Sequence, residues 1–336
     1  MKKVLASALV VFMAISCSKS EEPGVVGGDG FIFSAAAPST RAYFPGESGL
    51  MYWNNYDNIA AYSFDNTTLL ASDFCAITAE SAGTNEGQFK PTNILTSNAW
   101  TASQADTKTA TFYAYYPATN AAATYDNATN GVLLNIPTNQ SDEFGKSQIC
   151  FSTGVEMTVA EIKKSKLVRF AFEPATSLLR VRFTLSKDSD LSETHIKQLT
   201  ISAGDVLGGD CLLDFADGSL TPRGNNSTIS VVLRSAVKIT KNADENPYIY
   251  AVLMPSTASV GTLSFTATTS EGVKLTVAQK SSPADGFQGG VRYSLDREIA
   301  IKVNPDSPDA SYIDGGDAWG SQIVEDGSYN DAGNAW

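Results

Sequence analysis

Alternation of apolar and polar residues with a period of two is the feature that most constrains the fold of this chain. The run Leu179–Leu185 has an apolar residue at every second position, with arginines and a threonine between them. Ile229–Leu233, Leu263–Ala267 and Val273–Val277 repeat the pattern. Successive side chains of a strand point to opposite faces, so each run predicts a strand with one buried face. Many short strands separated by turns predict an all-β fold built of sandwiches.

The first half of the chain has strands that end at prolines. Asp57–Phe64 alternates, and Thr109–Tyr116 is rich in β-branched and aromatic residues and ends at Pro117. Gly131–Ile136 is a third short strand, ended by Pro137. Proline cannot donate to a strand ladder, which explains the stops.

Other elements are expected around these strands. Thr269–Gly272 reads as a hairpin turn between two alternating runs, and residues 248–255 (YIYAVLMP) read as a strand buried on both faces. Val168, Phe170 and Phe172 should share one face. Long helical periodicity is missing, and the one candidate for a short helix is 159–166.

The chain begins with a leader. Residues 1–17 read MKKVLASALVVFMAISC, with two lysines, an apolar stretch shorter than the roughly 20 residues that span a bilayer, and small residues before Cys17. This resembles a lipobox, which predicts a signal peptide over 1–16 and acylation (palmitate) of Cys17, and hence an outer-membrane anchor. Residues 18–22 (SKSEE) resemble the surface-export signal of Bacteroidetes-type lipoproteins. An ordinary signal peptide with a coincidental cysteine is the alternative.

The rest of the chain divides by composition. Residues 17–30 are polar and glycine-rich and predict a flexible, lipidated tether. We predict an N-terminal sandwich over 31–165 and a C-terminal sandwich over 166–304, with the charged stretch 161–166 at the junction.

The last segment, residues 305–336, carries acidic residues but no lysine or arginine. A hexamer of the form D-[GA]-G-[DN]-A-W recurs at 314–319 and 331–336. Two interpretations stay open. One is a mobile acidic tail, and the other is a segment that pairs with a partner or folds back on this chain.

Few residues of this chain suit catalysis or metal binding. His195 is the one histidine, in a polar run, and is expected to be a solvated residue beside a strand. Cys75, Cys150 and Cys211 are not in a C-x-x-C motif, so they are expected to be core residues, with one disulfide at most. Asp188 and Asp190 could touch calcium but read better as a turn.

Charge and motifs exclude further classes of function. The net charge of −12 disfavours a nucleic-acid partner. Neither a P-loop nor a dinucleotide-binding fingerprint is found in the sequence. We therefore predict a protein that is not an enzyme and that has no cofactor and no metal.

Several segments, taken in order, resemble the fimbrillin-like (Mfa-like) family of type V pilus subunits and accessory lipoproteins. They extend over residues 31–303 and comprise Thr40-Arg41-Ala42, WNNYDNIAAY (53–62), FYAYYP (112–117), IPTNQ (136–140), VRFAF (168–172), LLRVRF (178–183), YAVLMP (250–255) and GVRYSL (290–295). Trp53 is expected in the core and Asp57 in a turn.

The resemblance implies two transthyretin-like, Greek-key sandwiches in series. It also implies a role as stalk, tip, anchor or accessory subunit in fimbriae and in cell adhesion, with other fimbrillin subunits as partners. In stalk subunits a protease cuts after an arginine and frees the first strand, and a strand from a neighbouring subunit replaces it. Arg41 and Ala42 match that cleavage point, and residues 31–35 (FIFSA) would be the removable strand.

Two alternative functions stay open. A surface glycan-binding lipoprotein would present aromatic platforms to a host or bacterial surface glycan, and its candidate residues are Trp100, Tyr113, Tyr115 and Trp319. A lipoprotein hydrolase built on an unrecognised carboxylate pair is the other.

Overall fold

The computed structural model describes residues 32–36, 53–91, 100, 105–118, 125–126 and 130–301. Strands dominate this part of the chain, as the sequence predicts, so the fold is all-β. Its helical elements are short: α2 (Val159–Ser165), η1 (Phe144–Lys146) and η2 (Ala243–Glu245). Within these residues no helix is long and apolar enough to cross a membrane.

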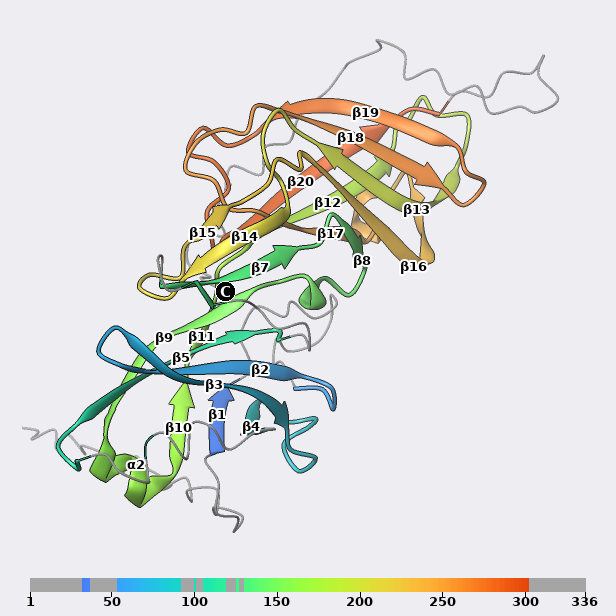
Figure 1. Ribbon diagram of the computed structural model, residues 1–336. Coiled ribbons are helices and arrows are strands. Elements are labelled where there is room, and N and C mark those ends of the chain that lie inside the picture. Colours follow the sequence, from blue (N-terminus) through green and yellow to red (C-terminus); the bar gives the residue numbers. More distant parts are fainter. Residues whose placement is uncertain are drawn as a thin grey trace, which may run out of the picture.

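The largest sheet has eight strands in the order β10-β1-β4-β3-β2-β5-β9-β11 and forms the lower part of Figure 1. The chain enters it with β1 (Ile32–Ala36), β2 (Asn58–Asp65), β3 (Thr68–Ile77), β4 (Glu86–Pro91) and β5 (Thr109–Tyr116). It returns with β9 (Cys150–Thr158), β10 (Leu167–Phe170) and β11 (Phe172–Pro174). The first strand along the chain is therefore an interior strand of this sheet.

Three smaller sheets form the upper part of Figure 1. The four-stranded sheet contains β15 (Leu220–Pro222), β14 (Gly209–Asp214), β7 (Gly131–Ile136) and β6 (Tyr125–Asp126). The three-stranded sheet contains β17 (Tyr248–Leu253), β12 (Ser177–Leu185) and β20 (Arg292–Ile299). The five-stranded sheet contains β19 (Lys274–Ser281), β18 (Thr262–Thr269), β13 (Glu193–Ser202), β16 (Thr228–Thr240) and β8 (Asn139–Ser141).

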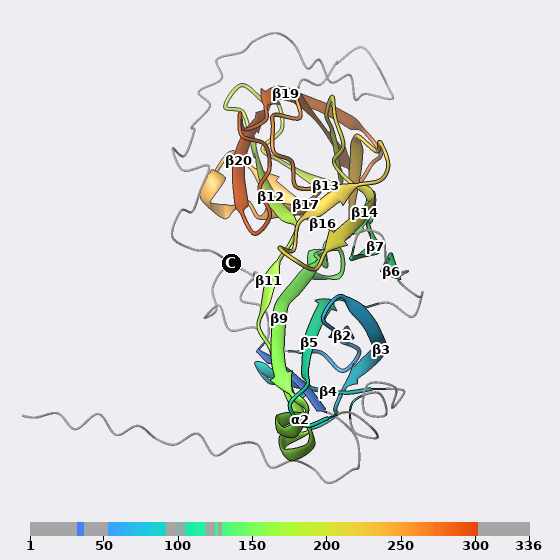
Figure 2. The same cartoon turned by 60° about the vertical axis from the view of Figure 1, so that its left-hand side comes forward.

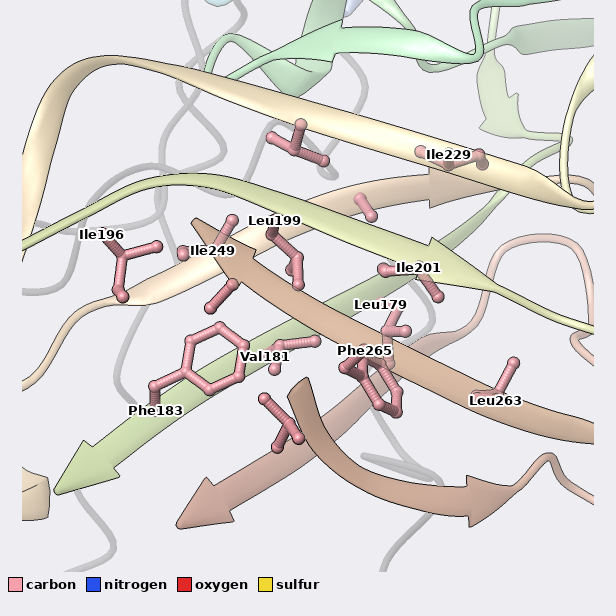
Figure 3. Packing of buried hydrophobic residues seen from close by; sticks show 14 of the residues in the cluster. Leu179, Val181, Phe183, Ile196, Leu199, Ile201, Ile229, Ile249, Leu263 and Phe265 are labelled. Atoms are coloured by element: carbon pink, nitrogen blue, oxygen red, sulfur yellow. The ribbon is translucent and has the colours of Figure 1, made fainter. Parts of the chain in front are cut away.

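The alternating runs of the second half build one hydrophobic core. Val181 and Phe183 of β12 pack in it with Leu199 and Ile201 of β13 and Phe265 of β18, as Figure 3 shows. These side chains are buried, while the arginines between them on β12 lie on the other face. Burying each large apolar side chain contributes about 1.5–3 kcal/mol, so the two-residue period determines which face of each sheet turns inward.

A second core is formed by side chains of the eight-stranded sheet together with Trp53, Trp100 and residues of α2. A third core lies between that sheet and the upper sheets. In the third core, Tyr62 and Phe64 of β2 contact Phe215, with ring centroids 5.0 and 6.1 Å apart. Figure 2 shows β9 and β11 running between the two groups of sheets.

Several local predictions are confirmed. The observed β5 and β7 have the predicted bounds, and β18 pairs with β19 across the predicted turn. The predicted short helix is α2. It begins at a capping box in which the side chain of Thr158 accepts from the N–H of Glu161, and the Glu161 carboxylate accepts from the N–H of Thr158. It ends at Lys166, which has a left-handed φ of 50°.

Strand pairing crosses residue 165 in both directions. From the first half, β7 pairs with β14 and β8 pairs with β16. From the second half, β10 pairs with β1 and β11 pairs with β9. The two halves of the sequence therefore share sheets.

The strand β17 is buried on both faces only along its second half, whereas the sequence predicted this for its whole length, because Tyr248 and Tyr250 are half-buried. Ala251 belongs to the core of the second half, whereas Val252 and Met254 belong to the core that joins the sheets. The side-chain amide of Gln140 closes the edge of β17: its Nε2 donates to the carbonyl of Val252 at 2.7 Å, and its Oε1 accepts from the Val252 N–H at 2.9 Å.

Candidate functional site

The first strand is held between two neighbours. β1 runs parallel to β10, with Phe33 opposite Val168, and antiparallel to β4, with Phe33 opposite Phe89. At its start the N–H of Ile32 donates to the carbonyl of Lys166 at 2.9 Å. We call the surface beside and beneath β1, formed by β4, β10, Trp53 and Phe112, the β1 seat.

Phe33 anchors β1 in the seat. Its side chain is fully buried and stacks on Phe170, with ring centroids 5.5 Å apart and planes at 16°. It also meets the ring of Phe112 edge-on at 6.4 Å. Aromatic pairs of this geometry add about 0.5–1.5 kcal/mol to the burial of their surface, so this side chain fixes β1 firmly.

Trp53 holds the other end of β1. Its indole Nε1 donates to the carbonyl oxygen of Ala35 at 3.0 Å, in a buried environment. The indole ring packs edge-on against Phe89 at 4.9 Å and Tyr116 at 5.2 Å. Trp53 is 1% exposed, so the prediction that it is a core residue is confirmed. Its bond to β1 could not be predicted from its local sequence.

Asp57 fixes the turn that carries Trp53. Its Oδ2 accepts from the N–H of Asn54 at 2.7 Å, and its Oδ1 accepts from the hydroxyl of Tyr116 at 2.8 Å. This carboxylate therefore ties the turn before β2 to the end of β5, which confirms the predicted turn role of Asp57.

Gly87 leaves room for the indole. It lies opposite Ala35 in the ladder between β1 and β4. A Cβ at Gly87 would lie 2.7 Å from Cε2 of Phe89 and 2.8 Å from Cδ1 of Trp53. Contacts this short do not occur in real structures, so this position requires glycine. Sequence reasoning missed it, because it sits within an otherwise ordinary strand.

The predicted lipidation and cleavage residues lie outside the described residues. These are Cys17, Arg41 and Ala42, and the same holds for residues 305–336 with Trp319. The structure brings β1, which precedes Arg41 by a few residues, together with Trp53, which follows it.

The groups with nucleophilic or metal-binding chemistry are dispersed. Cys75, Cys150 and Cys211 are buried and form no disulfide bond with one another, and burial raises the pKa of Cys211 to about 12. His195 lies within β13, opposite Lys238, and not beside a strand as expected. Asp188 lies in the turn after β12. Among the described residues, no group of His, Cys, Asp and Glu could hold a metal ion.

The proposed aromatic platform is not assembled by the residues that the sequence suggested. Trp100 and Tyr115 are interior, with exposed fractions of 0% and 3%, so neither can stack on a sugar. Tyr113 is half-buried and stacks on Phe215 at 5.1 Å. The three side chains are parts of cores, which corrects the expectation for Trp100 and Tyr115.

The fold and the β1 seat define a class: an all-β protein in which a strand from near the start of the chain is held between two neighbouring strands. The fimbrillin-like family model matches residues 40–308, and this chain belongs to that family. Membership implies a fimbrial or adhesion protein exposed at the cell surface. Among curated protein sequences no match was found.

Solved structures share the fold at low identity. A protein from Bacteroides ovatus ATCC 8483, provisionally assigned to cell adhesion, aligns with a TM-score of 0.51 at 12% identity over 80% of this chain and 91% of that one. A protein from Bacteroides uniformis ATCC 8492, provisionally assigned to the same role, aligns with a TM-score of 0.51 at 14% identity over 80% of this chain and 92% of that one. At these identities the similarity is one of fold.

Proposed function

We propose that this chain is a lipid-anchored subunit or accessory component of a surface fimbrium that joins other fimbrillin-like subunits by exchanging β1. The observation that carries the proposal is the position of β1: a five-residue strand near the start of the chain, hydrogen-bonded on both sides in the interior of a sheet. Cleavage between Arg41 and Ala42 would cut the covalent link between β1 and the rest of the chain.

Loss of β1 would leave buried groups exposed that another strand could cover. It would expose the facing edges of β4 and β10 and the rings that surround Phe33. Burial of Phe33 alone contributes about 1.5–3 kcal/mol, and unpaired edge groups are a template for another strand. A strand from a neighbouring subunit would satisfy both, which is β-augmentation.

The remaining parts of the proposal concern anchoring and modules. Acylated Cys17 would hold the uncleaved chain in the outer membrane, with residues 17–30 as the tether, and cleavage after Arg41 would separate the chain from this anchor. Two transthyretin-like sandwich modules would follow. Each module would contain strands from both sides of residue 165, in keeping with the pairs β1–β10, β7–β14 and β8–β16. The tail, residues 305–336, would be offered to a partner.

The assembly test uses bacteria that display the chain. Arg41→Ala, deletion of residues 305–336, and both together are compared with the matched control Arg223→Ala, because Arg223 is exposed and distant in sequence. Surface fibres are counted by electron microscopy, and the N-terminus is read by mass spectrometry. The proposal expects an N-terminus at Ala42 in fibres and loss of fibres with the double change. Unchanged fibres in the double variant would eliminate the stalk role.

The anchoring test is separate. Radiolabelled palmitate should be incorporated into the uncleaved Arg41→Ala chain, and adding Cys17→Ser should abolish both the label and the retention in the outer membrane. Incorporation that survives Cys17→Ser would contradict lipidation at this residue.

A further inference from the structure

The β1 seat has two inward side-chain positions of very different size. Phe33 and Ala35 point into the same core from alternate positions of β1, and both are buried, at 0% and 4% exposure. One position holds a phenyl ring and the other a methyl group. The residues around these two positions determine which side-chain sizes a strand in the seat can have.

The large position is lined by rings. Phe170 stacks on Phe33 at 5.5 Å, and Phe112 meets it edge-on at 6.4 Å. A small side chain here would leave a cavity among aromatic residues. Truncation of a buried phenylalanine is among the most costly single changes to a hydrophobic core.

The small position is limited by Trp53. Ala35 lies opposite Gly87, and side chains at directly opposed positions of an antiparallel pair project to the same face. The space where a Gly87 Cβ would stand is occupied by Trp53, whose Cδ1 and Nε1 are both 2.8 Å from that point. The same indole donates to the carbonyl of Ala35 at 3.0 Å, so it lies against both backbones.

Trp53 cannot easily move away from this position. Phe89 and Tyr116 hold its ring edge-on at 4.9 and 5.2 Å, and Phe172 lies at 6.3 Å. A shift would also break the buried hydrogen bond to β1, which would leave a buried donor without its acceptor.

We infer that the seat selects its strand by a two-position rule: a bulky apolar side chain where Phe33 stands, and a side chain no larger than alanine two residues later. Trp53 and Gly87 are the specificity-determining residues for the second position. This inference rests on the proposed function, because the strand that it describes is a segment of another subunit.

The test uses peptide exchange into the full chain. Residues 37–42 are replaced by the recognition sequence of a site-specific protease, and the folded chain is cut there once. Fluorescent peptides of residues 30–37 (GFIFSAAA) are then added, either unchanged or with Phe33→Ala or Ala35→Val, and their dissociation constants are measured by fluorescence anisotropy.

The unchanged peptide tests the proposed function, and the comparison among peptides tests the inference. We expect the Ala35→Val peptide to bind at least about fivefold more weakly, since overpacking a core costs about 1–3 kcal/mol. The Phe33→Ala peptide should bind more than about a hundredfold more weakly. Failure of the unchanged peptide to enter would contradict strand exchange itself. Equal binding of the unchanged and Ala35→Val peptides would overturn the rule while leaving strand exchange intact.

A second variant identifies the selecting residue. Trp53→Phe removes part of the indole, so the preference for alanine over valine should fall to less than about threefold. Tyr56→Ala is the matched control, because Tyr56 lies in the same turn but is 91% exposed, and it should keep the full preference. An undiminished preference in Trp53→Phe would assign the selection to another residue and overturn the role of Trp53.

Discussion

The hydroxyl of Tyr116 donates a 2.8 Å hydrogen bond to Oδ1 of Asp57, across 59 positions of the chain. The same tyrosine ring supports Trp53 at 5.2 Å, and Trp53 donates to β1. Asp57, Tyr116 and Trp53, three of the residues that carry the family resemblance, therefore form one connected support for the β1 seat. Their separation in sequence hides this, because they come from a turn and from the end of β5.

Tyr116→Phe should destabilise the protein by about 1–2 kcal/mol, because it keeps the ring but leaves one oxygen of Asp57 without its donor. Urea unfolding followed by circular dichroism measures the change in the free energy of unfolding. Tyr56→Phe, at a 91% exposed position, should change it by less than about 0.5 kcal/mol. Equal effects of the two substitutions would mean that the Tyr116–Asp57 bond does not support the fold.

Gln140→Leu should cost about 2–4 kcal/mol, because it leaves the N–H and the carbonyl of Val252 without their partners at the edge of β17. Native-state hydrogen exchange should show the N–H of Val252 losing protection. Gln279→Leu is the control, since Gln279 is exposed on β19 and its side-chain amide donates to the hydroxyl of Ser264 at 3.1 Å instead of to a backbone group. Retained protection at Val252 would contradict the proposed role of Gln140.

Glu161 should stabilise the start of α2 in a pH-dependent way. Its pKa is lowered from the ordinary value of 4.5, first by the hydrogen bond that its carboxylate accepts from the Thr158 N–H. A lowered folded-state pKa means that the stabilisation is present above pH 4.5 and is lost as the pH falls through the folded-state value. At pH 7 the Thr158 N–H should therefore be more protected from hydrogen exchange in the unchanged protein than in the Glu161→Gln variant. In acid the protection of this N–H should become equal in the two proteins. A difference that is constant down to pH 3 would contradict this.

The sequence predicted what local pattern and turn chemistry determine. The prediction of β5 follows from β-branched and aromatic residues that end at a proline, that of β7 from a short run that also ends at a proline, and that of the β18–β19 hairpin from two alternating runs around a turn. The predicted short helix is observed as α2, and the structure adds the capping box at its start. The pairing of β8 with β16 and of β10 with β1 could not be predicted in this way. These contacts join segments far apart in the chain, and their register depends on packing that no local window contains.

The candidate site was predictable in outline only. The strand expected over residues 31–35 overlaps the observed β1, which spans Ile32–Ala36, and Trp53 was expected in the core. The indole bond to Ala35 and the need for glycine at position 87 depend on the distance between two backbones and one ring. Such distances are properties of the assembled sheet.

The central claim is that subunits join at the β1 seat, and crosslinking at Gln88 tests it most directly. Gln88 lies opposite Ser34 of β1, and both are half-buried on the same ladder. A photo-crosslinking amino acid at Gln88 should, in intact surface fibres, link two subunits through a segment other than residues 32–36. The same probe at Thr276 serves as the control. Thr276 is exposed on β19, away from the β1 seat, so this probe should not give the crosslinked pair of subunits that the Gln88 probe gives. Fibres in which the Gln88 probe still links only to Ser34 of its own chain would contradict the account.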